Sequence, residues 1–488
     1  MLIATAWGFT LHTVQGARGL SIRALLNLRP VAAAAWASLA VTLAACAAQG
    51  PLAADPEGQL FARGLDEIVD VYIQPVTSRQ LALAGIARLT RLDGDLGVSE
   101  SGVAGALVLS YGGHDIGVYA TPGDMNGRKW GELLAALVAA AKDASPRLAA
   151  LSKDTIDQTV FDGMTTPLDR FSHYSAPKLA RAQRAARDGF GGIGVTLEAA
   201  SDMFRVTAVM PHGPADRAGI RPEDQIVAID GVATVGRPYE EVDRQLRGPV
   251  GSAVALSVLH PGTAQPGDVR LSRTLVTVPT VTVSRDGDIA LFHIAGFNRS
   301  TTQRIADGLA SVRQQAGGHL AGIVLDLRGS PGGLLDQAVS LGDLFIHDGP
   351  IVSTVGRHPA SHQYFAASGA GTALQTPLAV LINGSSASAA EILAAALQDT
   401  GRAVVIGSSS YGKGTVQTVL RLPNNGELTL TWARLITPSG YFLQTHGVVP
   451  TLCTSDLGDD EQALETGLQR LAAGSAAGPP ARPRAGLD

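Results

Sequence analysis

Hydrophobic residues recur with a helical period over residues 58–188, which predicts a mostly helical region. The clearest repeats lie in Leu65–Tyr72 and Ala82–Leu89, where apolar residues stand three or four positions apart. A Gly-rich stretch, Gly94–Lys129, interrupts this period with β-like apolar runs, and the helical period returns in Trp130–Leu151. The first part of the chain is therefore expected to form helices with an inserted β segment.

After residue 286 the pattern changes to short apolar runs that alternate with amphipathic stretches. Short apolar runs bounded by turn signals are typical of buried strands, so the alternation argues for an α/β layer architecture. Asn424-Asn425-Gly426 is a hairpin signal between the last two runs. The expected strands are Ile289–Ile294, Ile323–Leu327, Leu378–Ile382, Ala403–Ile406, Thr415–Leu420 and Leu428–Leu435, and the expected helices are Thr301–Gln315 and Leu334–Phe345.

One of these strands runs into Asn383–Asp399, a stretch that opens with small residues and is expected to end as an amphipathic helix. A strand, a tight turn and a helix can present a serine at a helix N-terminus, where unpaired N–H groups and the helix dipole favour negative charge. A nucleophilic alkoxide and a developing oxyanion both need such a place. The alternative is that Ser385, Ser386 and Ser388 only cap the helix and form the turn.

Two further stretches favour chemistry at this turn. Lys413 lies between two glycines beside the expected strand Thr415–Leu420. Desolvation among small and apolar residues would lower its pKa towards that of a general base, although an ordinary solvated lysine is the alternative. Upstream, Gly322–Gly333 predicts a buried strand followed by a Gly-rich loop, whose backbone N–H groups can approach a substrate carbonyl. Taken alone, its Pro-Gly-Gly is only a turn signal.

Together these stretches resemble the C-terminal processing proteases, the tail-specific serine peptidases that use a Ser/Lys dyad. Residues 386–391 (SASAAE) match the family's Ser-Ala-Ser-Ala-Ser-Glu pattern, in which the middle serine is the nucleophile. The one departure is Ala390 in place of the third serine, which is not the nucleophile. The resemblance therefore implies that Ser388 is the nucleophile, and it extends over most of the chain after about residue 155.

The resemblance also implies the other parts of the catalytic site. Gly412–Gln417 (GKGTVQ) matches the family's lysine pattern, so Lys413 would be the base and Gln417 would help to position it. The interval between Ser388 and Lys413 resembles the family's spacing. No cofactor and no metal is expected. The oxyanion would be stabilised by backbone N–H groups, that of Ala389 and one from the loop at Gly332 and Gly333.

Other functions remain open at this point. The resemblance implies a core of the kind shared with the Clp peptidases and crotonases, but nothing supports an acyl-CoA enzyme. A catalytically inactive scaffold that binds C-terminal tails is the alternative, although the joint presence of the three catalytic candidates speaks against it. A Ser-His-Asp triad is the rival mechanism, yet none of the core histidines stands in a recognisable triad motif, so they are interpreted as surface or structural residues. These histidines are His293, His319, His347, His358, His362 and His446.

The region from Gly189 to about Pro279 resembles a PDZ domain. Phe190-Gly191-Gly192-Ile193-Gly194 stands where that fold keeps its carboxylate-binding loop, and Pro214–Gly219 and Asp224–Gly231 fit the rest of the pattern. Backbone N–H groups of such a loop capture a C-terminal carboxylate while the peptide adds as a strand, and the expected helix Glu240–Leu246 would flank the groove. The expected partners are protein substrates with apolar C-terminal tails, besides an adaptor or regulatory protein.

The first residues resemble a targeting segment. Arg18, Arg23 and Arg29 precede the apolar run Val31–Ala45, in the order of the n-region and h-region of a signal peptide. The run ends before Cys46 in a sequence that resembles a bacterial lipoprotein box, so either Cys46 is lipidated or an ordinary secretory signal is cut nearby. Both alternatives predict export to the periplasm or to a membrane surface facing it, with membrane contact only through an N-terminal lipid.

The composition excludes several classes of function and of site. The 488 residues are 45% hydrophobic and 17% charged, and the formal net charge of −5 offers no basic face for nucleic acid. Two cysteines exclude a disulfide framework, and the scattered histidines show no zinc spacing. Asp169, Arg170, His173 and Tyr174, which end the helical region, are interpreted as structural. The expected segments are a signal over 1–46, a mostly helical region with an insertion over 47–188, the PDZ domain over 189–280, the serine protease core over 281–452 and a partly disordered tail over 453–488.

Overall fold

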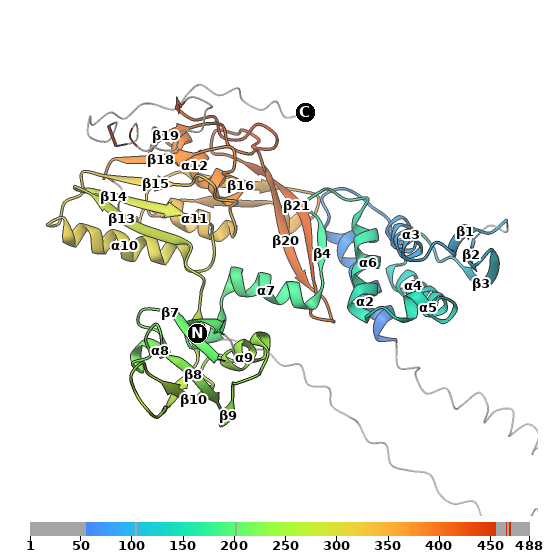
Figure 1. The fold of residues 1–488 in the computed structure, drawn as a ribbon. Helices are drawn as coiled ribbons and strands as arrows, with labels where there is room; N and C mark the ends of the chain where they lie inside the picture. Colours follow the sequence, from blue (N-terminus) through green and yellow to red (C-terminus); the bar gives the residue numbers. More distant parts are fainter. Residues whose placement is uncertain are drawn as a thin grey trace, which may run out of the picture. The chain divides into compact units, whose positions relative to one another are not determined.

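The computed structural model describes residues 55–454, except residues 103–104, 201–202, 372 and 374, together with residues 465, 468 and 469. This part of the chain forms a helical N-terminal region, a small β-rich unit and an α/β unit with two sheets (Figure 1). The expected mixed fold with N-terminal helices is thus confirmed, whereas the likeness of the core to Clp peptidases and crotonases stays a prediction. Within the described ranges, no helix is both long and apolar enough to cross a bilayer.

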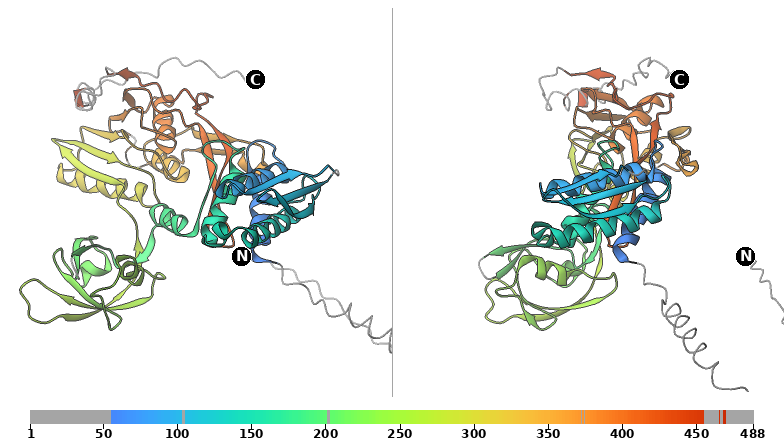
Figure 2. Two further views of the ribbon diagram at one scale, coloured as in Figure 1. Left: turned by 45° about the vertical axis from the view of Figure 1, so that its right-hand side comes forward. Right: turned by 90° about the vertical axis from the view of Figure 1, so that its right-hand side faces the viewer.

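The N-terminal helices pack around the fully buried side chains of Phe61, Trp130 and Phe161. Their first turns are capped by side chains, as where the Asp55 carboxylate accepts the N–H of Glu57. The Gly-rich interruption folds as an antiparallel three-stranded sheet (Figure 2). The elements are α2 (Pro56–Val71), α3 (Ser78–Leu89), η1 (Thr90–Leu92), β1 (Leu96–Glu100), β2 (Ala106–Tyr111), β3 (His114–Ala120), α4 (Gly127–Ala144), α5 (Pro146–Ala149) and α6 (Lys153–Thr165).

The β-rich unit follows strand β4 (His173–Ser175) and helix α7 (Pro177–Asp188). Helix α7 ends at Gly189, whose φ of 81° is readily adopted only by glycine. The main sheet of the unit has the strand order β11-β10-β8-β7-β6, so β6 lies at an edge. The elements are β5 (Phe190–Gly192), β6 (Val195–Ala200), β7 (Met203–Val209), α8 (Pro214–Arg217), β8 (Gln225–Ile229), β9 (Val232–Ala233), α9 (Tyr239–Leu246), β10 (Ala253–Leu259), β11 (Gly267–Ser272) and β12 (Thr274–Val276).

The larger sheet of the α/β unit has the order β13-β14-β15-β18-β19-β22, parallel except for the edge strand β13. Alternate residues of its central strands pack against the helices on one face or into a smaller cluster on the other. Burial on both faces explains why the central strands are continuous apolar runs. The elements are β13 (Val281–Asp286), β14 (Ile289–Ile294), α10 (Thr301–Gln315), β15 (Gly322–Asp326), α11 (Leu335–Asp343), β18 (Leu378–Ile382), α12 (Ala389–Asp399), β19 (Val404–Gly407) and β22 (Leu452–Cys453).

A second sheet completes the α/β unit and joins it to the N-terminal region. Its order is β17-β16-β21-β20, and β4 pairs with β21 beyond the main path. Leu428 and Leu430 of β21 belong to the same buried cluster as the N-terminal helices, so these parts share a core. The Asn424–Gly426 hairpin lies between β20 and β21 as predicted. The elements are β16 (Pro350–Val355), η2 (Pro359–Ser361), β17 (Gln363–Ala366), β20 (Thr415–Arg421) and β21 (Glu427–Ile436).

Helix α12 corrects one expectation from the sequence. We expected an amphipathic helix, but every residue from Ala389 to Gln398 is buried. Its many alanines allow close packing on all sides, and the polar side chains of Glu391 and Gln398 are buried with it. Gln398 donates to the Val449 carbonyl at 3.0 Å, and Glu391 lies in the site described below. A buried polar residue therefore marks an internal hydrogen bond here, not a solvent-facing side.

Candidate active site

Hydrogen bonds to the loop that follows β15 hold the turn that carries Ser388 in place. Ser386 is fully buried, and its hydroxyl donates to the Leu327 carbonyl at 2.8 Å. The Ala387 N–H donates to the Ser330 carbonyl at 2.9 Å. Ser386 thus has the structural role that the sequence left open for this serine cluster, and it leaves Ser388 as the serine at the start of α12.

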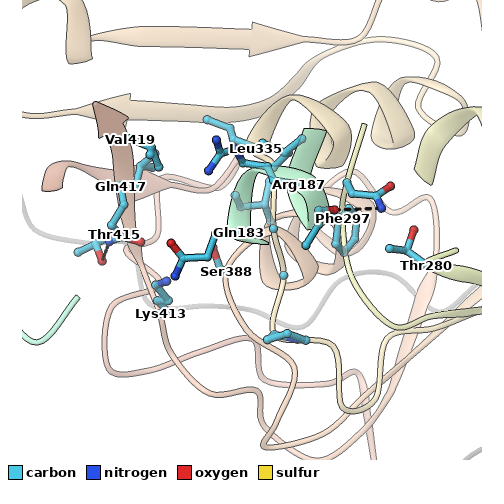
Figure 3. A pocket seen from close by; sticks show the side chains of 18 of the residues that line it. Gln183, Arg187, Thr280, Phe297, Leu335, Ser388, Lys413, Thr415, Gln417 and Val419 are labelled. Carbon is cyan, nitrogen blue, oxygen red and sulfur yellow. Dashed lines mark hydrogen bonds between the residues drawn. The ribbon is translucent and has the colours of Figure 1, made fainter. Parts of the chain in front are cut away.

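The backbone of Ser388 is strained. Its φ of 55° and ψ of −115° lie where residues with a side chain are seldom found. Such conformations cost about 1–3 kcal/mol and gather at active sites. The strain presents the side chain of Ser388 to a cavity of about 700 Å³ instead of continuing the helix (Figure 3).

Glu391 joins the serine helix to the lysine loop. Its fully buried carboxylate accepts the backbone N–H of Ser388 at 2.8 Å and that of Lys413 at 2.9 Å. It also accepts the N–H of Gly412 at 2.7 Å and the hydroxyl of Ser410 at 2.5 Å. A buried carboxylate is costly unless it is hydrogen-bonded, and these donors meet that need while fixing the two motifs together.

Lys413 lines the same cavity as Ser388 (Figure 3). Burial lowers the pKa of Lys413 below the ordinary lysine value. The carboxylates of Asp169 and Glu391 raise this pKa, and the Arg170 guanidinium lowers it further. Its Nζ lies 4.9 Å from the centre of the Phe171 ring. No hydrogen bond joins Lys413 to Ser388 among the described residues, but such contacts often form only with substrate.

Gln417 also lines the cavity, on strand β20 after the lysine loop. Its amide donates to Thr415 Oγ1 at 3.0 Å and to Thr431 Oγ1 at 3.1 Å. These bonds fix the Gln417 side chain, but within the described chain none of its hydrogen bonds reaches Lys413. Its role in positioning the lysine therefore stays a prediction.

The oxyanion candidates lie together beside Ser388. A Cβ atom on Gly332 would come within 2.7 Å of the Ala389 nitrogen and 2.9 Å of the Ser388 Cβ, so this loop touches the serine turn. The Gly332 carbonyl accepts the N–H of Phe297 at 3.0 Å, which ties the loop to the next segment. In the described ranges, the N–H groups of Gly332, Gly333 and Ala389 have no protein acceptor, and Gly332 and Gly333 line the cavity, so these groups stay candidates for stabilising an oxyanion.

The histidines do not favour a triad. The lining of the Ser388 cavity contains no histidine among the residues that the structure describes. His293 lies 3.4 Å from the Asp326 carboxylate, and the His446 ring packs at the edge of Tyr441. The interpretation of the core histidines as surface or structural residues agrees with these contacts.

Only part of the predicted tail-binding loop is a free loop. Phe190, Gly191 and Gly192 form β5, which pairs with β12. Ile193 and Gly194 make the turn into the edge strand β6; their carbonyls accept other N–H groups, and their own N–H groups have no protein acceptor in the described chain. Any carboxylate site here would rest on this second half. Cys46, the lipidation candidate, lies outside the described residues.

Sequence reasoning missed two residues of the site. Glu391 stands in the quoted motif but was given no role, although a serine followed three positions later by a glutamate is a helix-capping signal. Phe171 lies in a segment interpreted as structural, and its neighbours support that in part, since the Asp169 carboxylate accepts the N–H of Ser172 at 2.9 Å. No signal in the sequence placed the Phe171 ring beside Lys413.

The similarity of the chain to known proteins agrees with this geometry. Residues 288–453 match the model of peptidase family S41, and residues 205–259 match the model of the PDZ domain. A carboxy-terminal-processing protease from Bartonella bacilliformis is 37% identical over 297 residues, which cover 60% of this chain and 68% of that protein. A probable CtpA-like serine protease from Staphylococcus aureus is 30% identical over 334 residues, which cover 64% of this chain and 66% of that protein.

The chain spans about two thirds of the length of these relatives. Among solved structures, a photosystem II D1 C-terminal processing protease is 24% identical, with a TM-score of 0.41, over 87% of this chain and 98% of that one. The family and PDZ resemblances drawn from the motifs are confirmed by the family models and by the Bartonella relative. The chain belongs to the carboxy-terminal-processing proteases of family S41, a family of serine-type peptidases, and it carries a PDZ domain.

Proposed function

We propose that this chain is an exported endopeptidase that cleaves proteins near their C-termini with a Ser388/Lys413 dyad. The observation that carries the proposal is the shared cavity: a serine with a strained backbone and a lysine with a lowered pKa line the same space. Strained residues gather at active sites, and an amine with a lowered pKa can act as the base that activates a serine.

Acylation follows from these groups. Neutral Lys413 takes the proton of the Ser388 hydroxyl while Oγ forms a bond to the substrate carbonyl carbon. The negative charge that develops on the carbonyl oxygen is met by the N–H of Ala389 and by one from the Gly332–Gly333 loop. The C–N bond then breaks, and protonated Lys413 gives its proton to the leaving amine.

Deacylation returns the enzyme to its first state. A water molecule attacks the ester carbon of the acyl-enzyme as Lys413 takes one of its protons. The ester C–O bond breaks, the new C-terminus leaves, and the proton returns to the Ser388 oxygen. The same lysine therefore acts as base and acid in both halves, which requires a pKa near the operating pH.

We assign recognition of apolar substrate tails to the PDZ domain. The edge strand β6 can accept an added peptide strand, and the free N–H groups of Ile193 and Gly194 precede it. Helix α9 contributes the apolar residues Val242 and Leu246 to the same buried core as Ile193. An adaptor or regulatory protein as a further partner stays a prediction.

Export is proposed from the sequence of residues 1–46 alone. Metabolic labelling with a fatty-acid analogue in a bacterial host would detect lipidation. Label on the wild type that is absent from Cys46→Ala would support the lipoprotein form. An unlabelled protein released to the periplasm would assign an ordinary cleaved signal, and a protein retained in the cytoplasm would contradict export.

The experiment that tests the activity uses an unstructured protein with an apolar tail and a matched protein with a charged tail. The full-length wild type should cleave the first faster, whereas Ser388→Ala and Lys413→Ala should cleave neither. Cleavage that persists in Lys413→Ala would show that the base is misassigned. Tail binding without cleavage by the wild type would favour an inactive scaffold.

A further inference from the structure

Strand β20 leaves one of its edges unpaired inside the cavity that holds Ser388. It follows Lys413 directly and pairs with β21 alone among the described strands. Thr415, Gln417 and Val419 of this strand line the cavity (Figure 3). Unpaired strand edges are usually blunted by proline, lysine or a covering element, and the stretch TVQTV has neither proline nor lysine.

The direction of the backbone groups of β20 follows from its hydrogen bonds. Residues of an antiparallel pair alternate between those that bond to the partner strand and those whose N–H and C=O point away. At one end the Leu422 N–H donates to the Gly426 carbonyl at 3.0 Å, and at the other the Leu435 N–H donates to the Gly414 carbonyl at 2.8 Å. Both bonds set the same alternation, so Thr415, Gln417 and Val419 point their backbone groups towards the free edge.

The middle of the strand gives an independent check. Thr431 lies opposite Gln417 in the register. Its carbonyl accepts the Ile73 N–H at 2.9 Å, and its own N–H donates to Ser172 Oγ at 3.0 Å, so its backbone groups are used on the side away from β20. The pair Thr431 and Gln417 therefore exchanges no ladder bonds, and the backbone of Gln417 is free.

We propose that this free edge binds the substrate backbone as an added strand and so sets the register of the scissile bond at Ser388. The inference rests on the proposed function, because its ligand is the extended peptide that the dyad cuts. Gly332 and Gly333 line the same cavity, and within the described chain their N–H groups have no protein acceptor, so the substrate would pass between this loop and the free edge of β20. Backbone pairing is independent of side chains, which suits an enzyme that must accept many sequences near the cut.

A proline at Val419 tests the edge without breaking the ladder. Proline is tolerated where the N–H of an edge strand does not bond to its partner, so Val419→Pro should keep the fold while it removes one donor. Loss of one backbone hydrogen bond to substrate should lower kcat/KM by about 3- to 10-fold, mainly through KM. Arg421→Pro is the matched control, because Arg421 points the same way but lies outside the cavity lining, and it should keep wild-type kinetics.

A second measurement needs no variant. Peptide substrates with a single N-methyl group at successive positions around the cut, and with an unchanged tail, should show losses of kcat/KM at alternate positions. Such a period of two is the signature of strand pairing. A uniform decline, or none, together with wild-type kinetics of Val419→Pro would overturn the inference and leave the protease intact.

The remaining outcomes separate the inference from the function beneath it. No cleavage by the wild type, or cleavage that survives Ser388→Ala, would remove the proposed function and this inference with it. A dimer that Val419→Pro dissociates, seen by light scattering, would assign the edge to a second copy of the chain and overturn the inference. Melting curves of both proline variants show whether the fold is kept.

Discussion

The Oε2 atom of Glu391 accepts the backbone N–H of Lys413 at 2.9 Å, although the two residues belong to different motifs. The same carboxylate accepts the N–H of Ser388, so one buried side chain ties the serine turn to the lysine loop. Glu391→Gln would turn an amide NH₂ towards backbone donors. We expect a fall in kcat of at least about tenfold and a loss of about 1–3 kcal/mol in the free energy of unfolding.

Gln398 supplies the control for this prediction. It is buried on the same helix but bonds to Val449 and Thr451 instead of the lysine loop. Gln398→Leu should destabilise the protein by a similar amount while the folded fraction keeps its kcat. Equal activity in the Glu391 and Gln398 variants, measured under conditions where both are folded, would show that Glu391 is only structural.

Activity should rise with pH through the deprotonation of Lys413. Because burial lowers this pKa, the midpoint of the rise in kcat/KM should lie below pH 10.5, the ordinary pKa of lysine. Arg170 lowers the pKa further, so Arg170→Gln should move the rise to higher pH. Arg128→Gln, on the exposed side of α4, should leave the profile unchanged. A shift to lower pH in Arg170→Gln would contradict this electrostatic account.

Because the backbone of Ser388 is strained, we expect glycine to be a more stable substitution than alanine there, the reverse of the usual order. At a φ of 55° a Cβ atom is unfavourable, so Ser388→Gly should be more stable than Ser388→Ala by about 1 kcal/mol. The exposed neighbour Ser385 has no such φ, and there glycine should be the less stable substitution. Urea unfolding of the four variants measures both differences, and the same order at both positions would refute the strain.

Gly332 should tolerate no side chain. A Cβ atom there would lie 2.5 Å from the Ala387 carbonyl oxygen, in addition to its contacts with the serine turn. Gly332→Ala should therefore abolish cleavage by displacing the loop or the nucleophile. Gly329, in the same loop, also has a positive φ of 73° but open space around its Cα. Gly329→Ala should lose stability from backbone strain alone and keep most of its activity, as a cleavage assay would show.

Much of the fold could be read from the sequence because its central strands are simple signals. Leu378–Ile382 is a continuous apolar run between turns, and it is β18 with the same bounds. Strand β13 was missed because most of its residues are exposed, which leaves no apolar period. The sequence predicts an amphipathic helix at α12, whereas Glu391 and Gln398 are both buried there.

The candidate site, like the fold, could be predicted from the sequence only in part. Short motifs predict Ser388 and Lys413 as the catalytic pair, and the structure places both residues in the lining of one cavity. The contact between Phe171 and Lys413 could not be predicted, because the two residues are far apart in the sequence and meet where the segment before β4 lies beside β21. Contacts between residues far apart in the sequence depend on the completed sheet, and no local pattern records them.

The position of Phe171 bears on how much of the chain a fragment must contain to keep the surroundings of Lys413. A fragment from β13 to β22 would contain the serine, the lysine and the oxyanion loop, but it would leave behind Phe171 and the α7 residues that line the cavity. Lys413 would then lose part of the burial that lowers its pKa. The minimal working unit is therefore longer than the α/β sheet that carries the motifs, and it includes the segment from Phe171 through α7.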